Sequence, residues 1–242
     1  MISWRGEGLL LAARTHGETS AIIDVFTPDQ GRYAGVVRGG ASRKMTPVLQ
    51  PGATLAVEWS ARLEEHLGTF RVEPQTSRAA LMGHRATLAT LSAVCGLLRE
   101  TLPERSPVPG LYERTIALLE SMPMGDWMSN YVLWELDLLS DLGFGLDLSK
   151  CAATGAREDL VYLSPKSGVA VSRAGAGAWA DKLLPLPAFL RTRQSGQAQD
   201  IVDGLRTTGF FLRERLAKSL HKERLSEPRD AAERAIRKLL EG

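Results

Sequence analysis

The sequence predicts an α+β protein in which a small five-stranded β-barrel precedes a mainly α-helical region. Three observations lead to this prediction. Short runs of β-branched and aromatic residues, separated by turn residues, fill about the first 75 positions. From residue 77 onward, apolar residues recur at a spacing of three and four, which is typical of helices. A polar interval rich in Gly and Ser, residues 145–178, then carries one short hairpin.

Five apolar runs make up the predicted barrel. Pro28 presets a turn and Gly31 accepts a positive φ, so the second and third runs form a hairpin. Leu55, Val57 and Trp59 alternate onto one face of the fourth run. The oligonucleotide-binding (OB) fold has this size and strand number, and a small SH3-like barrel is the nearest competitor. The five runs are residues 8–14, 20–26, 32–37, 53–59 and 66–73.

The helical region contains five predicted helices. Ser77 is a suitable N-cap for the first, and Asp126 and Gly143 are suitable residues to begin and end the third. The third helix is apolar on most sides, which predicts burial. The helices cover residues 77–102, 111–122, 126–143, 196–222 and a short segment from Pro228. We therefore expect a barrel domain over residues 1–76 and a helical domain over residues 77–242.

The composition indicates the general class of protein but says little about its activity. The 242 residues are 44% apolar and 24% charged, which is ordinary for a soluble globular protein. The formal charge of +2 does not require a polyanionic partner, so any such partner must be argued from local clustering. Two cysteines fit a reducing compartment. The run LLLAA is too short for a secretory signal and nothing is long enough to span a membrane, so we expect a cytoplasmic protein.

Catalytic signatures are missing from the sequence. RGGASRKMT resembles a phosphate-binding loop only loosely, because Pro47 precedes any following helix. Ser219 and Lys222 spell S-x-x-K without the companion motifs of penicillin-recognising enzymes. Glu135 and Asp137 fall on different faces of a helix, and the four histidines are scattered. With no nucleophile beside a base, we expect a protein that is not an enzyme.

One stretch has the form of a degenerate zinc ribbon. Residues 146–175 follow the order knuckle, strand, turn, strand, knuckle. Cys151 occupies the position of a first ligand, but Thr154 stands where a second cysteine belongs. The second knuckle, placed at about Val171 and Ala174, offers no thiolate or imidazole. One ligand cannot hold a structural zinc, so we expect no metal.

A run of positive charge follows the third predicted strand. No acidic residue occurs between Asp29 and Glu58, and Gly39 and Gly40 allow the backbone to turn or to approach a phosphate closely. Tyr33 points away from the cationic face of the strand, so we expect it in the core or facing a partner rather than stacked on a base. The run is either a solvated loop or a phosphate-binding surface. The candidate nucleic-acid-binding residues are Arg32, Arg38, Arg43 and Lys44.

A second basic region lies in the helical part. Arg191 and Arg193 flank FLRTRQSG, and further cations follow along the long helix, offset by acidic residues such as Glu214. A solvated helix face is the simpler interpretation. The alternative is an auxiliary DNA surface or a pocket for an acidic peptide tail, in which an arginine beside apolar side chains takes the terminal carboxylate.

Several segments together resemble the bacterial recombination mediator family RecO. RTHGETSAIIDVFTPDQGRYAGVVRGGASRK is similar to the N-terminal barrel of that family, and LQPG resembles its LQPF segment. WELDLLSDLGFGLDLSKCAATG is similar to its stretch FELRLLxxLGYxPxLxxCxxCG, and YLSPKSG follows where that module continues. The likeness spans nearly the whole chain. Many members carry four cysteines in the ribbon, whereas this sequence keeps only Cys151.

The resemblance implies a function in DNA repair and homologous recombination. It implies a non-enzymatic protein, associated with the nucleoid, that binds single- and double-stranded DNA and anneals complementary strands. It also implies association with RecR and with the acidic C-terminal tail of single-strand-binding protein. With RecR, and with RecF, such a protein helps to load RecA onto coated strands.

Two other functions remain open at this point. The chain could be a protein–protein adaptor of the repair machinery whose basic loop is only solvated. It could also be an RNA-binding OB-fold protein, because such barrels bind both nucleic acids. Fold alone does not choose among these functions.

Overall fold

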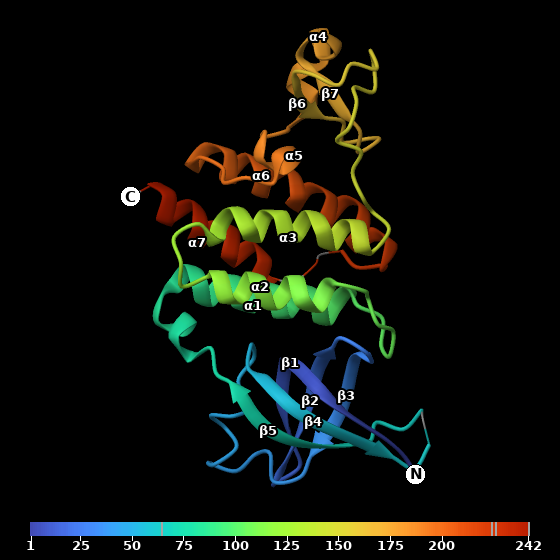
Figure 1. Cartoon of the computed structure of the whole chain (residues 1–242), viewed down its shortest axis with the longest axis vertical. Coiled ribbons are helices and arrows are strands. Elements are labelled where there is room, and N and C mark those ends of the chain that lie inside the picture. The colour runs from blue at the N-terminus through green and yellow to red at the C-terminus, as the bar shows by residue number, and fades with distance from the viewer. Residues whose placement is uncertain (64, 224, 226, 242) are drawn as a thin grey trace. The chain divides into compact units, whose positions relative to one another are not determined.

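A computed structural model describes residues 1–63, 65–223, 225 and 227–241 (Figure 1). Contacts between Cα atoms group the chain into two compact units. The first unit is Met1–Ile116 with Ser226–Ala235, and the second is Ala117–Leu225 with Ile236–Gly242. None of the helices in the described part of the chain is both long and apolar enough to pass through a membrane.

The first unit contains a closed five-stranded barrel, as the sequence predicts. The strands follow the order β1-β2-β3-β5-β4 around the barrel. Neighbouring strands are antiparallel except β3 and β5, which close the barrel in parallel. Closure leaves no free sheet edge, which removes the usual site of strand-to-strand aggregation. The strands are β1 (Ile2–His16), β2 (Ser20–Thr27), β3 (Gly31–Val37), β4 (Thr54–Ala61) and β5 (Thr69–Thr76).

β1 is longer than the predicted run at residues 8–14. Its first half pairs with β4, from Ile2 opposite Ala61 to Leu9 opposite Thr54, and its second half pairs with β2. The first half escaped prediction because only one of its faces is apolar. There Trp4 packs against the barrel core while Ser3 and Arg5 are exposed.

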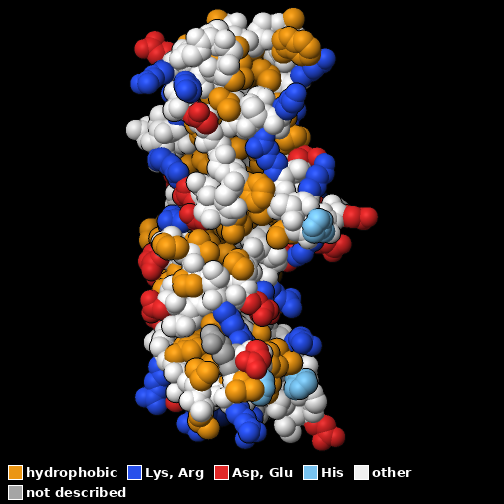
Figure 2. Space-filling view, turned by 90° about the vertical axis from the view of Figure 1, so that its right-hand side faces the viewer, with side chains coloured by type: hydrophobic (Ala, Val, Ile, Leu, Met, Phe, Trp, Pro, Cys, Tyr) orange, Lys and Arg blue, Asp and Glu red, His pale blue; other side chains and the backbone are white. Residues whose placement is uncertain are grey.

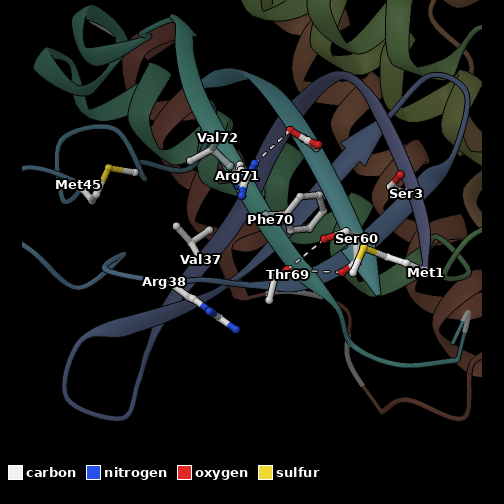
Figure 3. A pocket seen from close by; sticks show the side chains of 11 residues that line it. Met1, Ser3, Val37, Arg38, Met45, Ser60, Thr69, Phe70, Arg71 and Val72 are labelled. Carbon is white, nitrogen blue, oxygen red and sulfur yellow. Dashed lines mark hydrogen bonds and ion pairs between the residues drawn. The ribbon is translucent and has the colours of Figure 1, made fainter. Parts of the chain in front are cut away.

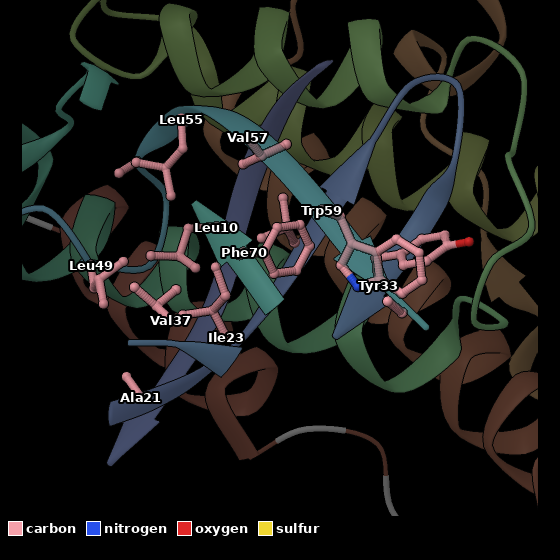
Figure 4. Packing of buried hydrophobic residues seen from close by; sticks show 13 residues of the cluster. Leu10, Ala21, Ile23, Tyr33, Val37, Leu49, Leu55, Val57, Trp59 and Phe70 are labelled. Carbon is pink, nitrogen blue, oxygen red and sulfur yellow. The ribbon is translucent and has the colours of Figure 1, made fainter. Parts of the chain in front are cut away.

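The barrel core is formed by the inward face of each strand (Figure 4). Leu55, Val57 and Trp59 of β4 are all buried, which confirms the alternation read from the sequence. Tyr33 is 5% exposed and its ring meets that of Trp59 at 5.1 Å between centroids, edge to face. Tyr33 is therefore a core residue, as expected, and is not available to stack on a base.

The segment after the first long helix closes one end of the barrel. The amide of Arg105 donates to the carbonyl of Arg32 at 2.8 Å. The Arg105 guanidinium lies 5.1 Å from the ring centroid of Tyr33, a cation–π contact. Gly31 has a φ of +71°, and a Cβ at this position would overlap the backbone of Ser106. The predicted turn glycine is thus required both by its backbone angle and by a close approach.

The first predicted helix, residues 77–102, is divided in the structure. A 3₁₀ turn, η1 (Ala79–Gly83), precedes α1 (Arg85–Thr101), because His84 between them has an extended backbone. Ser77 accepts only a local bond from the amide of Ala79, so its predicted role as N-cap is wrong. Cys95 on α1 is 3% exposed, and burial raises the pKa of its thiol to about 12.

The remaining elements are mostly helical. α2 (Leu111–Ser121) and α7 (Glu227–Glu241) contribute residues to both units. The second unit also contains α3 (Trp127–Asp141), α4 (Arg173–Ala176), η2 (Gly177–Lys182), α5 (Phe189–Thr192), α6 (Ala198–Phe211) and the π-helical turn η3 (Leu212–Ala217). Its small sheet has the order β7-β6-β8 and comprises β6 (Leu160–Leu163), β7 (Ala170–Ser172) and β8 (Leu184–Pro185). The hairpin was predicted, but the two-residue strand β8 was not.

The predicted burial of α3 is confirmed. Tyr131, Val132, Leu138 and Leu139 are each fully buried. The helix ends at Asp141, and Gly143 just beyond its C-cap has a φ of +85°, a backbone angle that residues with a Cβ adopt only at a cost. The predicted long helix over residues 196–222 forms as α6 followed directly by η3, so its hydrogen-bonding pattern changes within the predicted range.

Candidate nucleic-acid interface

The basic loop, residues 38–53, is an ordered structure between β3 and β4. The amides of Met45 and Thr46 both donate to the carbonyl of Ser42 at 3.0 Å, which forms a helical turn. The amide of Ala41 donates to the carbonyl of Thr19 at 3.0 Å and so holds the loop to the β1–β2 hairpin. Leu49 is buried in the barrel core. These contacts fix the path of the loop and with it the position of its cations.

Three of the four predicted cations lie on this loop. Arg38, Arg43 and Lys44 are all exposed. Among the described residues, none of the three is held by a carboxylate. Gly39 has a φ of +72° with open space around it, so it bends the chain directly after Arg38. The three side chains are therefore available to an anionic ligand.

Arg32, the fourth predicted cation, belongs to a different environment. Its guanidinium bonds Asp24 at 2.9 Å, Glu104 at 3.2 Å and the carbonyl of Leu102 at 3.1 Å. Its side chain is only 14% exposed. A guanidinium already bound to two carboxylates in a shielded position gains little from a phosphate. We therefore base the proposed surface on the other three cations, and a DNA contact of Arg32 stays a prediction.

A groove of about 620 Å³ lies beside the basic loop on the outside of the barrel (Figure 3). Arg38 from the loop and Arg71 from β5 both line it. Hydroxyl groups of Ser3, Ser60 and Thr69 line it as well, and the last two oxygens are 3.3 Å apart. We call this feature the barrel groove. Cations and hydroxyls together are the side chains that contact phosphate and sugar in nucleic-acid complexes.

Strand register explains why these side chains meet. Ser3 on β1 pairs with Ser60 on β4, and Ser60 pairs with Thr69 on β5. Arg71 lies two residues beyond Thr69 and therefore on the same face. The parallel pairing of β3 and β5 ends at Val37, so Arg38 leaves β3 next to this row.

The groove contains no exposed aromatic side chain among the described residues that line it. Phe70 is its one aromatic residue and is 3% exposed, with its ring in the barrel core. The described residues of the groove thus offer no aromatic ring on which a base could stack. The face of the molecule in Figure 2 also mixes Lys and Arg with Asp and Glu, without a large area of one sign. The groove is suited to the sugar–phosphate backbone rather than to base sequence.

Sequence reasoning missed the strand-borne part of this surface. Arg5, Glu58 and Arg71 lie on three different strands, and no short motif connects them. The one available signal was the alternation of β5, which places Thr69 and Arg71 opposite the buried Phe70. Register between strands was also needed, and a single sequence does not supply it.

A second hollow, of about 500 Å³, lies in the second unit. Leu136, Leu148 and Leu190 line it, with Arg191 and Arg193 beside them. We call it the leucine hollow. Arg193 donates to both carboxylate oxygens of Asp137, at 2.9 and 2.6 Å, and these bonds raise the pKa of the guanidinium. Arg191 is exposed and donates to the carbonyl of Arg157 at 3.2 Å, so of the two arginines it is the one without a carboxylate partner in the described residues.

The ribbon hairpin does not fit a zinc ion. Cys151 accepts bonds at its sulfur from the amide and hydroxyl of Ser172, at 3.2 and 3.3 Å. A Cβ on Gly175 would also meet this sulfur. The second knuckle is therefore at Ser172 and Gly175, one residue beyond the predicted Val171 and Ala174. Within the described residues no three His, Cys, Asp or Glu side chains gather to hold a metal.

Hydrogen bonds take the place of further ligands around Cys151. Burial raises the pKa of the Cys151 thiol, but bonds from Ser172 and Thr154 outweigh it and lower the pKa to about 6. Thr154 and Ser172 thus stabilise a thiolate at the position where a ribbon would carry its first metal ligand. The knuckle is held together by a hydrogen-bonded sulfur.

Comparison with known proteins shows which family models and which proteins this chain resembles. A family model described as Recombination protein O N terminal matches residues 1–78, and one described as Recombination protein O C terminal matches residues 82–224. A protein of Ruegeria sp. (strain TM1040) named DNA repair protein RecO is 55% identical over 230 residues, 94% of this chain and 95% of that protein. Proteins of the same name are 53% identical in Cereibacter sphaeroides (strain ATCC 17029 / ATH 2.4.9) and 52% identical in Jannaschia sp. (strain CCS1). These two alignments cover 95% and 97% of this chain and 96% and 98% of those proteins.

Proposed function

This chain belongs to the RecO family of DNA repair and recombination proteins, which are non-enzymatic mediators, and from this premise we propose how it works. It binds single- and double-stranded DNA and anneals complementary strands. With RecR, and with RecF, it helps to load RecA onto strands coated by single-strand-binding protein. It acts in the cytoplasm at the nucleoid.

The barrel groove and the basic loop carry this proposal. Arg38 and Arg71 line one groove with three hydroxyl groups, and Arg43 and Lys44 extend the cationic track along the loop. Contacts of this kind bind the backbone of either a single strand or a duplex without reading bases. Annealing requires such indifference, because the two complementary strands have different sequences.

We further propose that the functional boundary lies after residue 76. The barrel, residues 1–76, would hold DNA, and residues 77–242 would serve partners. The two family models support this division, since one ends at residue 78 and the other begins at residue 82. The compact unit around the barrel extends further, because α1 packs against β1 and donates its Cys95 thiol toward the carbonyl of Leu10.

Fluorescence anisotropy of labelled single-stranded DNA at several salt concentrations tests the DNA-binding part. The variant R38A/R43A/K44A removes the three loop cations. The control K150A/R157A/K166A removes three exposed cations of the second unit and changes the net charge equally. We expect the log–log salt slope to shrink by about two in the loop variant and to stay unchanged in the control. Equal binding by all three proteins would place the contact elsewhere.

The same titration separates the two alternatives. If the wild type does not bind DNA even at low salt, the adaptor function replaces the one proposed. If it binds RNA of the same sequence more tightly than DNA, an RNA-binding function replaces it. Strand annealing is followed separately, by energy transfer between dyes on two complementary strands, and is expected to slow in the loop variant.

We propose that the leucine hollow receives the acidic C-terminal tail of single-strand-binding protein. Leu146 and Leu148 are half-buried in its lining and offer an apolar surface, and Arg191 beside them can take a terminal carboxylate. The test is anisotropy of a labelled peptide with the tail sequence. R191E should weaken binding at least several-fold, whereas R173E, at another exposed arginine, should not. If the two variants bound the peptide equally well, the leucine hollow would not be the binding site of the tail.

A further inference from the structure

Three charged residues form a row across neighbouring strands at the barrel groove. Arg5 on β1 is the register partner of Glu58 on β4, and Glu58 is the partner of Arg71 on β5. The Glu58 carboxylate lies 3.2 Å from the Arg5 guanidinium and 4.0 Å from that of Arg71. The Arg5 and Arg71 side chains are 79% and 88% exposed, and that of Glu58 is 31% exposed. One acid thus sits between two solvated cations.

Glu58 is an unusual member of this surface. It is the one acidic side chain among the described residues that line the groove, which otherwise presents cations, hydroxyls and apolar groups. A phosphate entering beside Arg71 would meet the Glu58 carboxylate at the same guanidinium. Carboxylate and phosphate use the same donors of arginine, so they compete for them.

We propose that Glu58 acts as an internal competitor anion, which occupies Arg5 and Arg71 in the free protein and yields them to DNA phosphates on binding. This inference rests on the proposed DNA-binding function; it adds Arg5 to the contacts and gives Glu58 a role beside Arg71. Exposed ion pairs are weak, so a phosphate can displace the carboxylate. The displaced Glu58 remains in the groove and repels the bound strand.

The Glu58 carboxylate would therefore limit the affinity of the protein for DNA. A protein that anneals strands must release them once the duplex has formed, and an acid beside the phosphate track hastens release. Neutralising Glu58 should therefore strengthen DNA binding and slow dissociation. Removing the cations should have the opposite effect, with Arg71 the larger contributor because it lines the groove together with Arg38.

The chain offers a matched control in Glu73. It lies two residues beyond Arg71 on β5 and so points to the same side of the strand. It is exposed, and no cation is paired with it in the described part of the molecule. E73Q removes the same charge as E58Q, on the same face of the neighbouring strand, without freeing an arginine. The difference between E58Q and E73Q measures competition rather than net charge.

The experiment is anisotropy of a labelled oligo-dT with wild type, E58Q, E73Q, R71A and E58Q/R71A over a range of salt concentrations. We expect E58Q to bind about three- to tenfold more tightly than wild type, the effect of releasing two exposed ion pairs. Its log–log salt slope should steepen by about one, because freed cations release more counterions from DNA. The gain should shrink in the R71A background. E58A serves as a second variant if the melting temperature of E58Q falls.

The outcomes separate this inference from the function on which it rests. If wild type binds with a steep salt slope but E58Q is no tighter than E73Q, the competitor role is wrong and DNA binding stands. If E58Q gains the same factor with and without Arg71, the gain is general electrostatics and the inference is overturned. If no variant binds DNA at low salt, the inference and the proposed DNA binding both fail.

Discussion

The guanidinium of Arg32 lies 2.9 Å from one carboxylate oxygen of Asp24, and Arg99 approaches the other oxygen at 3.0 Å. Asp24 belongs to β2, Arg32 to β3 and Arg99 to α1. One shielded carboxylate therefore ties two barrel strands to the first helix. Arg32, one of the four predicted nucleic-acid-binding cations, thus takes part in the contact between the barrel and its own helix.

Replacing Arg32 should test this structural role. The side chains of Arg32 and Asp24 are 14% and 12% exposed. Removing the Arg32 guanidinium leaves the shielded Asp24 carboxylate with Arg99 as its remaining cationic partner. We expect R32A to lower the free energy of unfolding by about 3 kcal/mol, the usual effect of breaking a buried ion pair. Urea denaturation followed by circular dichroism measures this change.

Arg38 provides the comparison. R38A, at an exposed arginine six residues later, should change the free energy of unfolding by less than about 0.5 kcal/mol. The DNA-binding effects should be reversed, with R38A weaker than wild type and R32A unchanged under conditions in which it is folded. If R32A were as stable as wild type but no longer bound DNA, Arg32 would be part of the DNA interface.

Two glycines with nearly equal backbone angles should differ in their tolerance of alanine. Gly31 and Gly39 have φ values of +71° and +72°. A Cβ at residue 31 would overlap the backbone of Ser106, whereas a Cβ at residue 39 would meet open space. We expect G39A to cost about 1 kcal/mol, the strain of a left-handed residue alone. G31A should cost clearly more, and comparable melting temperatures for the two variants would contradict the close approach of the segment at Ser106.

The thiol of Cys151 should make stability depend on pH. Burial raises its pKa, but bonds from Ser172 and Thr154 lower the pKa to about 6 from an ordinary value of 9.0. A pKa that is lower in the folded state stabilises the fold fully above pH 9, and this stabilisation is lost as the pH falls toward 6. The free energy of unfolding of wild type should therefore decline over this range relative to that of C151S.

C151S is a suitable reference because its hydroxyl fills the same place and does not ionise. The two proteins should differ most at pH 9 and converge near pH 6. A constant difference across the range would show that the sulfur is a neutral thiol. Ultraviolet absorbance of the thiolate, compared between wild type and C151S, provides a direct reading of the titration.

Trp179 should dominate the quencher-accessible fluorescence of the protein. Its side chain belongs to η2 and is 64% exposed, with the ammonium of Lys182 at 4.6 Å from the ring centroid. Trp59, Trp127 and Trp134 are at most 5% exposed. Acrylamide quenching should fall strongly in W179F, and the emission maximum should shift to shorter wavelength. W127F should leave quenching unchanged, and equal quenching in the two variants would contradict this placement of η2.

The barrel was predictable because its strands leave local signals. The turn at Pro28 and Gly31 and the alternation of Leu55, Val57 and Trp59 depend only on neighbouring residues. The first half of β1 was not predictable, because one of its faces is polar and its partners on β4 lie more than forty positions away in the sequence. The division of the first helix at His84 was likewise missed, because helical spacing of apolar residues continues through it.

The candidate site was predictable only where it is continuous in sequence. Arg38, Arg43 and Lys44 were found because they are close together in a segment free of acids. Arg32 was included for the same reason and proved to be bound to Asp24 and Glu104. Charge clustering in sequence does not reveal which cations are already paired.

The sequence by itself determined the class of fold and the position of the basic loop, because periodicity and turn residues act over a few neighbouring positions. Its motifs, in their order, carried the resemblance to the family. Only the tertiary structure decided which charges face one another. It brought Arg5, Glu58 and Arg71 together through strand register, and it enclosed Arg32 between Asp24 and Glu104. Electrostatic interactions depend on distance in space and on shielding from solvent, and both are set by the packing of segments far apart in the chain.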